Sequence, residues 1–156
     1  MADETGSVVR AVMGEDEAEW KRLYREYRAF YELASDDDAV DRTWEWVSNG
    51  EFGLSGLVVV RGGELAGLAN LRRFARPSSA SIGVYLDDLF TSPDHRRSGV
   101  ASELIDEARR IAGAEGSTIV RWVTAADNST ARSLYDSVAT ATRWVTYDLP
   151  VESSSH

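Results

Sequence analysis

Hydrophobic side chains recur along this chain with two different periods, one typical of helices and one typical of strands. Where the period changes, we expect one element to end and another to begin. Over residues 15–34 the large apolar residues follow helical spacing, namely Trp20, Leu23, Tyr24, Tyr27, Phe30 and Tyr31. We expect this stripe to form either core or the wall of a substrate cleft. A second helix is predicted over 38–48, after an acidic stretch at 35–38 that offers helix caps.

Runs of β-branched and alternating residues predict strands over 8–12, 57–61, 65–71, 82–91, 118–124 and 142–149. Gly62-Gly63 is a two-residue hairpin signal between the second and third of these strands. Residues 75–79 are expected to form a turn or loop. Apolar faces that begin at Val100 and Ala131 predict two more helices.

The order of these elements predicts a mixed sheet in an α/β (α+β) fold. Strand–helix–strand units in the second half favour parallel pairing, and the hairpin favours antiparallel pairing. A chain of 156 residues suits one domain, which we place at 1–150, with a disordered tail at 151–156.

Composition excludes several kinds of chemistry. The chain has no cysteine and two histidines, which argues against disulfides, thiol nucleophiles and multi-histidine metal sites. No apolar run approaches the roughly 20 residues that span a bilayer, so no membrane partner is expected. The acidic N-terminus lacks the pattern of a signal peptide, so we expect a cytoplasmic location.

Charge is spread unevenly within a net charge of −9. Residues 1–50 carry 13 acidic and 6 basic side chains, and residues 51–156 carry 13 acidic and 11 basic. This asymmetry favours either a cationic substrate or a solvated acidic surface. No basic patch with interleaved aromatic residues is present in the sequence, so a nucleic-acid partner is not expected.

The segment 95–102 carries the clearest candidate chemistry. It places His95, two arginines and Gly99 between an apolar strand and a helix start. Backbone N–H groups and the dipole at a helix N-terminus favour an anion, and arginines add charge-assisted hydrogen bonds. The sequence has no Gly-Lys pair for a P-loop and no three-glycine dinucleotide fingerprint here.

The motif Arg96-Arg97-Ser98-Gly99-Val100-Ala101 fits the pattern Arg/Gln-x-x-Gly-x-Gly/Ala. Residues 85–93 precede it, and Asn128-x-x-Ala131-x-x-Leu134-Tyr135 follows it. Together these features resemble the GNAT family of N-acetyltransferases over residues 82–149, and its histone/polyamine acetyltransferase branch most. The resemblance implies a single acyl-CoA N-acyltransferase domain. It also implies a mostly antiparallel sheet of six to seven strands flanked by about four helices.

The resemblance further implies acetyl-CoA as co-substrate and no metal. The pyrophosphate is expected on the N–H groups of residues 97–102, and the pantetheine arm along residues 89–91. The expected cofactor-binding residues are Leu89, Phe90, Thr91, Arg96, Arg97, Ser98, Gly99, Val100, Ala101, Ser102 and Asn128. For Asn128, a role as helix cap is equally open.

The implied reaction is direct attack of a primary amine on a thioester, with no covalent enzyme intermediate. Because such an amine has a pKa of about 10.4, a carboxylate or a water chain must remove a proton. Asp87 is our candidate base, through a water relay, although a structural salt bridge is an open alternative. Successive strand residues face opposite sides, so we expect only one of Asp87 and Asp88 to face the cleft. His95 is a weaker candidate.

Tyr135 is the candidate general acid, because a phenol is protonated at pH 7; the alternative is that it only packs. At 138–140 the chain has Val-Ala-Thr where many family members have glycine and an aromatic residue. The turn to the last strand is therefore expected to differ, and a homodimer is expected because some relatives dimerise there. The predicted function is acetyl transfer to a polyamine-like molecule or a lysine side chain. A non-catalytic acyl-CoA-binding or protein-interaction module is the alternative.

Overall fold

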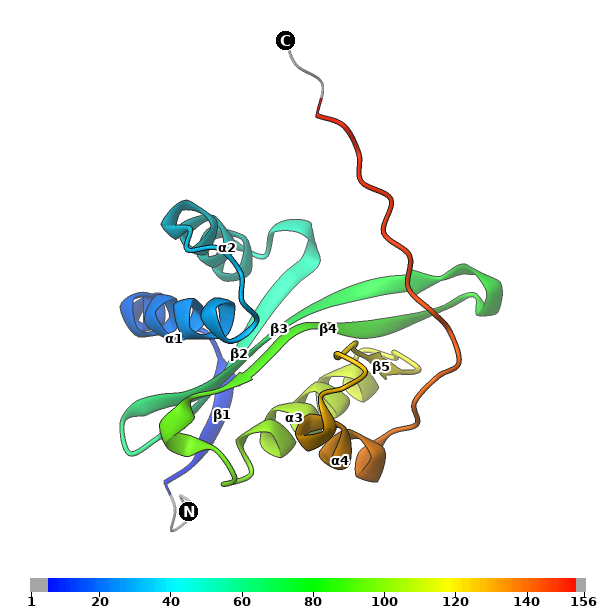
Figure 1. Ribbon diagram of the computed structural model, residues 1–156. Helices are drawn as coiled ribbons and strands as arrows, with labels where there is room; N and C mark the ends of the chain where they lie inside the picture. Colours follow the sequence, from blue (N-terminus) through cyan, green and yellow to red (C-terminus); the bar gives the residue numbers. More distant parts are fainter. Residues whose placement is uncertain (1–5, 154–156) are drawn as a thin grey trace. The chain divides into compact units, whose positions relative to one another are not determined.

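The computed structural model describes residues 6–153. They divide into a larger unit that ends at Val123 and a smaller one that begins at Thr124, and each is described by itself. The larger unit is built on a sheet of five strands in sequence order (Figure 1). The strands are β1 (Val8–Ala11), β2 (Leu54–Arg61), β3 (Glu64–Arg76), β4 (Ser81–Thr91) and β5 (Val120–Arg121).

Pairing in this sheet is antiparallel from β1 to β4 and parallel between β4 and β5. The prediction of a mixed, mostly antiparallel sheet is confirmed. The β2–β3 hairpin turns at Gly62 and Gly63, whose φ angles of 56° and 79° are those of a type I′ turn. The predicted loop at 75–79 is shorter, because β3 continues to Arg76 and η3 (Pro77–Ser79) makes the turn.

The expected number of six to seven strands is wrong for residues 6–153, which contain five. The predicted strand over 118–124 is reduced to two residues. Its register with β4 ends at Tyr85 opposite Arg121, just before an irregularity in β4. The predicted strand over 142–149 belongs to the smaller unit and is discussed with it.

Helices cover both faces of the sheet (Figure 1). One face carries α1 (Glu17–Phe30) and α2 (Asp37–Asn49), and the opposite face carries α3 (Val100–Ala114). The short helical turns η1 (Gly14–Asp16), η2 (Glu51–Gly53) and η4 (Pro93–His95) connect elements. Helix α2 begins as predicted, because the Asp36 side chain accepts a hydrogen bond from the Ala39 N–H at 3.0 Å.

The core of the larger unit lies between the sheet and these helices. Trp20 of α1 is fully buried and stacks on Tyr24 with ring centroids 4.7 Å apart. Val58 and Val59 of β2 are both fully buried, although neighbouring strand residues point to opposite faces. Burial on both faces explains why β2 is a continuous apolar run.

Gly67 sets how closely α3 can approach the sheet. A Cβ atom added at Gly67 would lie 2.4 Å from Val100 Cγ1 and 2.8 Å from the Phe90 carbonyl oxygen.

We expect Gly67→Ala to lower the free energy of unfolding by about 1–3 kcal/mol through overpacking. Denaturant unfolding measures it, and Gly113→Ala is the control. Gly113 has open space at its Cβ position and lies in α3, so its replacement should be neutral or slightly stabilising. Equal effects at the two sites would contradict the packing argument.

The smaller unit contains α4 (Ser129–Val138), which confirms the fourth predicted helix. Residues 139–153 have no regular secondary structure, so the predicted strand over 142–149 is wrong. The helix ends at Ala139 with extended backbone (φ −146°) instead of the left-handed glycine that commonly reverses a chain after a helix. Trp144 and Tyr147 are exposed, so the apolar burial that stabilises a strand is missing. Residues 154–156 of the predicted disordered tail lie outside the described residues.

Candidate active site

Strand β4 contains one extra residue where it pairs with β3. Asn70 lies opposite Asp88, and Leu71 lies opposite Leu86, so Asp87 has no partner position in the ladder. Such a bulge shifts the alternation of side chains by one residue. Asp87 and Asp88 consequently line the same pocket. The expectation that only one of them faces the cleft is wrong, because it assumed a regular strand.

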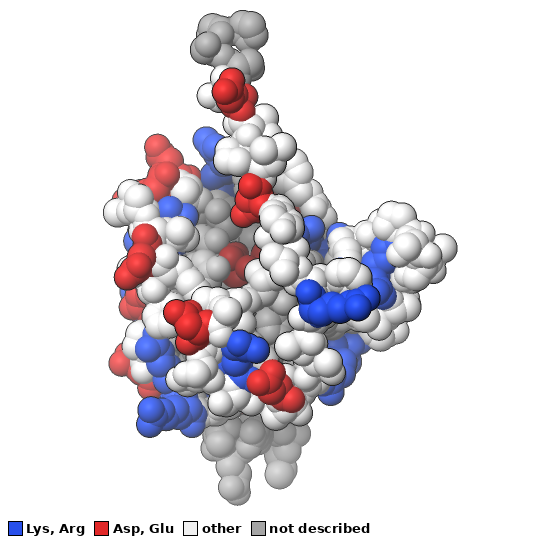
Figure 2. All heavy atoms as spheres, turned by 45° about the vertical axis from the view of Figure 1, so that its right-hand side comes forward, with Lys and Arg blue, Asp and Glu red and all other residues white. Residues whose placement is uncertain are grey.

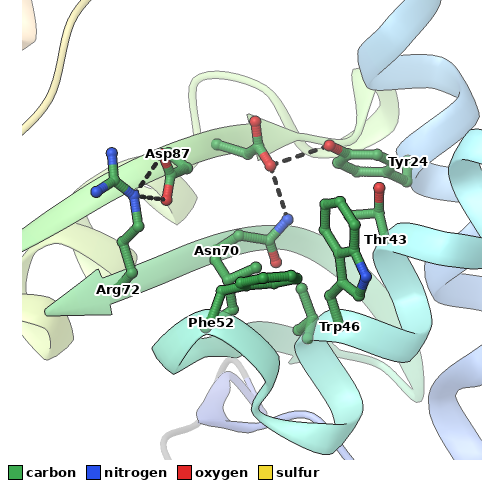
Figure 3. Close-up of a pocket in the computed structure, with 10 residues that line it drawn as sticks. Tyr24, Thr43, Trp46, Phe52, Asn70, Arg72 and Asp87 are labelled. Atoms are coloured by element: carbon green, nitrogen blue, oxygen red, sulfur yellow. Dashed lines mark hydrogen bonds and ion pairs between the residues drawn. The ribbon is translucent and has the colours of Figure 1, made fainter. Parts of the chain in front are cut away.

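The pocket lies in the larger unit, on the side of the sheet that carries α2, and has a cavity volume of about 390 Å³ (Figure 3). This volume lies in the ordinary range for small-molecule sites, about 300–1,000 Å³. Its lining combines apolar side chains with a polar end, and consists of Tyr24, Thr43, Trp46, Val47, Phe52, Leu54, Asn70, Arg72, Asp87 and Asp88.

Three donors hold the Asp88 carboxylate. Tyr24 Oη donates to Oδ2 at 3.0 Å, Tyr27 Oη donates to Oδ1 at 2.7 Å, and Asn70 Nδ2 donates to Oδ2 at 2.8 Å. Burial, reinforced by the charge of Asp88, raises the pKa of both phenols, so they stay protonated donors. The first part of the α1 stripe therefore serves as core, and Tyr24 and Tyr27 also support the cleft. Its last members, Phe30 and Tyr31, are exposed.

Asp87 is paired with Arg72. Arg72 Nε lies 3.1 Å and 2.9 Å from the two carboxylate oxygens. Burial raises the pKa of Asp87; the Arg72 hydrogen bond and charge lower it, and Asp88 adds a further small increase. A carboxyl group with a raised pKa is better matched to proton removal near neutral pH than an ordinary aspartate. The salt bridge left open from the sequence is therefore observed, Asp87 also lines the pocket, and its role as a base stays a prediction.

Asn70 was not identified from the sequence. Its residue is 1% exposed, and Oδ1 accepts no hydrogen bond from the residues that the structure describes. Figure 3 shows this amide beside Phe52 and Trp46, with its nitrogen toward the carboxylate above it. A single polar residue inside the apolar run 65–71 was the available signal, because buried polar groups normally find partners.

The predicted phosphate turn leads into α3. Gly99 is the N-cap with φ 85° and provides no capping side chain. The Glu103 N–H donates to the Gly99 carbonyl at 3.0 Å, so the N–H groups of residues 100–102 precede the first bond within the helix. Ser98 Oγ donates to the His95 carbonyl and closes the turn. An uncapped helix N-terminus of this kind fits a pyrophosphate.

The predicted cofactor residues have different surroundings. Arg96 lies over the Phe30 ring at 5.1 Å, while Val100 is buried beside Gly67 and can offer a ligand only its N–H. Phe90 is 5% exposed and belongs to the core, and Leu89 and Thr91 are half-buried. From Asp88 to Thr91, where it ends, β4 spans about 10 Å, and η4 follows before the turn. The weaker candidate, His95, lies 3.5 Å from Glu64 and does not line the pocket.

Asn128 and Tyr135 belong to the smaller unit. Asn128 Oδ1 accepts from the Ala131 N–H, and its Nδ2 donates to Thr124 Oγ1, both at 3.4 Å. The capping role of Asn128 is therefore observed, and its contact with a cofactor stays a prediction. Tyr135 lies on α4 and is half-buried, and its catalytic role also stays a prediction.

Comparison with known proteins decides the family. The Acetyltransferase (GNAT) family matches residues 20–139. The chain belongs to the GNAT family. This GNAT chain is 28% identical over 142 residues to D-amino-acid N-acetyltransferase HPA3 of Saccharomyces cerevisiae, covering 90% of the chain and 88% of the relative. It is 31% identical over 130 residues to the uncharacterized N-acetyltransferase YhfO of Bacillus subtilis, covering 82% and 85%.

Solved structures agree on the GNAT fold. The crystal structure of a probable acetyltransferase has a TM-score of 0.82 at 21% identity, covering 94% of this chain and 99% of its own. The aminoglycoside N-acetyltransferase AAC(6')-Iy in complex with CoA has a TM-score of 0.81 at 18% identity, covering 96% and 98%. The GNAT chain is therefore an acetyl-CoA-dependent acyltransferase, although the histone/polyamine branch is not specifically supported.

Other features of the GNAT chain concern possible partners. The face in Figure 2 carries acidic and basic side chains interspersed with one another. Within residues 6–153, no helix is long and apolar enough to cross a membrane. The same residues contain no group of three or more histidine, aspartate or glutamate side chains arranged to hold a metal ion.

Proposed function

We propose that this chain transfers the acetyl group of acetyl-CoA to a primary amine bound in the pocket beside the β4 bulge. The observation that carries the proposal is the pair of adjacent carboxylates, Asp87 and Asp88, in one pocket. The same strand runs from these carboxylates to Thr91, and η4 and a short turn connect it to the uncapped N-terminus of α3. A polyamine-like molecule and a lysine side chain are the two acceptors that the sequence favours.

The donor is held, in this proposal, by backbone groups. The N–H groups of residues 100–102 hold the pyrophosphate, and Arg97 adds positive charge. Arg96 is positioned by its contact with Phe30. Residues 89–91 line the path of the pantetheine arm. When bound, acetyl-CoA supplies an activated acetyl thioester.

The two carboxylates have different roles toward the amine, because one binds it and the other removes its proton. Asp88 is fixed by its three donors, so its remaining acceptor capacity locates the ammonium group of the substrate. Asp87 takes the proton that must leave before the amine can attack, directly or through one water. Its short side chain, tied to Arg72, favours the water.

The test of this function is release of CoA from acetyl-CoA in the presence of polyamines, amino acids, aminoglycosides, simple amines and lysine peptides. The expected result is turnover with at least one amine, together with thermal stabilisation by acetyl-CoA and not by ATP or NAD. Tight acetyl-CoA binding without turnover on any amine would favour the non-catalytic module. A cytoplasmic location and a homodimer remain predictions.

Tyr135→Phe tests the proposed general acid, whose hydroxyl would give its proton to the CoA thiolate as that group leaves. Because only the hydroxyl is lost, we expect kcat to fall by about 100-fold, as for loss of a positioned acid, with acetyl-CoA affinity unchanged. Steady-state kinetics and acetyl-CoA titration measure the two quantities. Tyr147→Phe is the matched control, because Tyr147 is 90% exposed in the same unit. A Tyr135→Phe protein with the full rate would remove Tyr135 from the mechanism.

A further inference from the structure

Phe52 is held in an unusual way at the edge of the pocket. Its φ angle is 56°, between Gly50 at 71° and Gly53 at 73°, and its side chain is 76% exposed. A bulky residue with left-handed backbone is strained, and such strain concentrates at ligand sites. The Phe52 ring meets the Trp46 ring edge-on, with centroids 5.1 Å apart. Two rings therefore form an apolar wall that the fold leaves uncovered.

The net charge at the polar end of the pocket matches one monovalent cation. Asp87, Asp88 and Arg72 are the charged residues among those that line it, and they sum to a single negative charge. One ammonium group balances that charge. The second ammonium of a diamine would enter the aromatic end, where it could contact the rings but would find no carboxylate to balance its charge. The carboxylate of an amino acid would have to compete with Asp87 for Arg72.

Asn70 supplies a second acceptor at that end. Its Nδ2 donates to Asp88 Oδ2, which fixes the orientation of the amide and leaves Oδ1 as the acceptor. An N–H donor of a ligand would satisfy this buried oxygen, whose unpaired state is costly. Asn70 and Asp88 lie opposite each other on β3 and β4, so their side chains belong to the same end of the pocket.

We infer that the acceptor is a primary amine with a single positive charge and an apolar, ring-bearing body. The inference rests on the proposed acetyl transfer, and it replaces the polyamine-like molecule and the lysine side chain that the sequence favours as acceptors. Asp88 and Asn70 bind the ammonium group, and Trp46 and Phe52 pack against the ring. A free arylalkylamine and a lysine side chain both carry a primary ammonium group, but only the arylalkylamine carries a ring. The test must therefore distinguish these two acceptors.

The experiment measures CoA release with 2-phenylethylamine, ethylamine, 1,4-diaminobutane, phenylalanine and a lysine peptide. We expect kcat/KM for 2-phenylethylamine to exceed that for each other acceptor by at least about tenfold. A preference for the diamine, the amino acid or the peptide would overturn the inference while leaving acetyl transfer intact. No turnover on any amine would instead count against the proposed function, which keeps the two failures distinct.

Variants locate the selectivity. Phe52→Ala and Trp46→Ala should each lower the ratio of kcat/KM for 2-phenylethylamine over ethylamine about tenfold. The exposed position of Phe52 makes its variant safe for folding, which circular dichroism checks. Leu33→Ala, an exposed apolar side chain that does not line the pocket, should keep the ratio. An unchanged ratio in Phe52→Ala would contradict the aromatic contact.

Discussion

Replacing Asp87 by asparagine should lower kcat/KM for the amine by about 100-fold to 1,000-fold. The change keeps the size of the side chain and leaves one oxygen to accept from Arg72 Nε, but it removes the group that takes the proton. General-base catalysis commonly contributes this much. Steady-state CoA release measures the effect. Asp106→Asn is the control, because Asp106 is exposed on α3. If Asp87→Asn keeps the full rate and Asp88→Asn loses it, the roles of the two carboxylates are reversed.

The pH profile gives an independent check on Asp87. A base works deprotonated, so kcat/KM falls as the pH falls through its pKa. Burial places that pKa above the usual value for aspartate, and Arg72 holds it down in part. Arg72→Gln removes the lowering influence, so the acidic limb of the profile should move to higher pH. A limb that stays in place would show that another group controls it.

Gly99→Asp should weaken acetyl-CoA binding by at least about tenfold. The new carboxylate would stand at the helix N-terminus, where it repels the pyrophosphate and competes for the same N–H groups. Loss of even one charge-assisted hydrogen bond costs about 1.5–3 kcal/mol. Titration with acetyl-CoA, followed by fluorescence or thermal shift, measures the loss.

Gly99→Asn separates charge from backbone strain. Asparagine has the same shape as aspartate, tolerates positive φ better than most residues and carries no charge. At φ 85° both variants are strained to a similar degree, so a larger loss of binding in Gly99→Asp is the effect of charge. Equal binding by the wild type and Gly99→Asp would place the pyrophosphate elsewhere.

Local signals accounted for the parts of the structure that the sequence predicted well. The Gly62-Gly63 turn and the Asp36 cap are decided by a few adjacent residues, and both form as expected. The uncapped start of α3 at Gly99 is also local. Element order then sufficed for the antiparallel and parallel pairings.

The acceptor pocket could not be predicted in the same way, because it depends on residues far apart in the chain. Tyr24 and Asp88 are 64 positions apart and meet only in the folded sheet. The prediction that Asp87 and Asp88 point to opposite faces was wrong, because two adjacent aspartates carry no sequence signal for a bulge. The strand expected over 142–149 has an alternating pattern, but a pattern forms a strand only when a partner edge is available.

The extra residue in β4 has a consequence for how such a site can arise. In a regular strand only every second side chain points to a given face, so two acids that are adjacent in sequence lie on opposite faces. Inserting a single codon at position 87 brings a second acid onto that face and leaves both flanking segments of the strand in place. Deleting the same codon would undo it. Insertion of one residue is thus enough to convert a regular sheet surface into a site with two carboxylates. Alignments of relatives should show a one-residue gap where the site is absent.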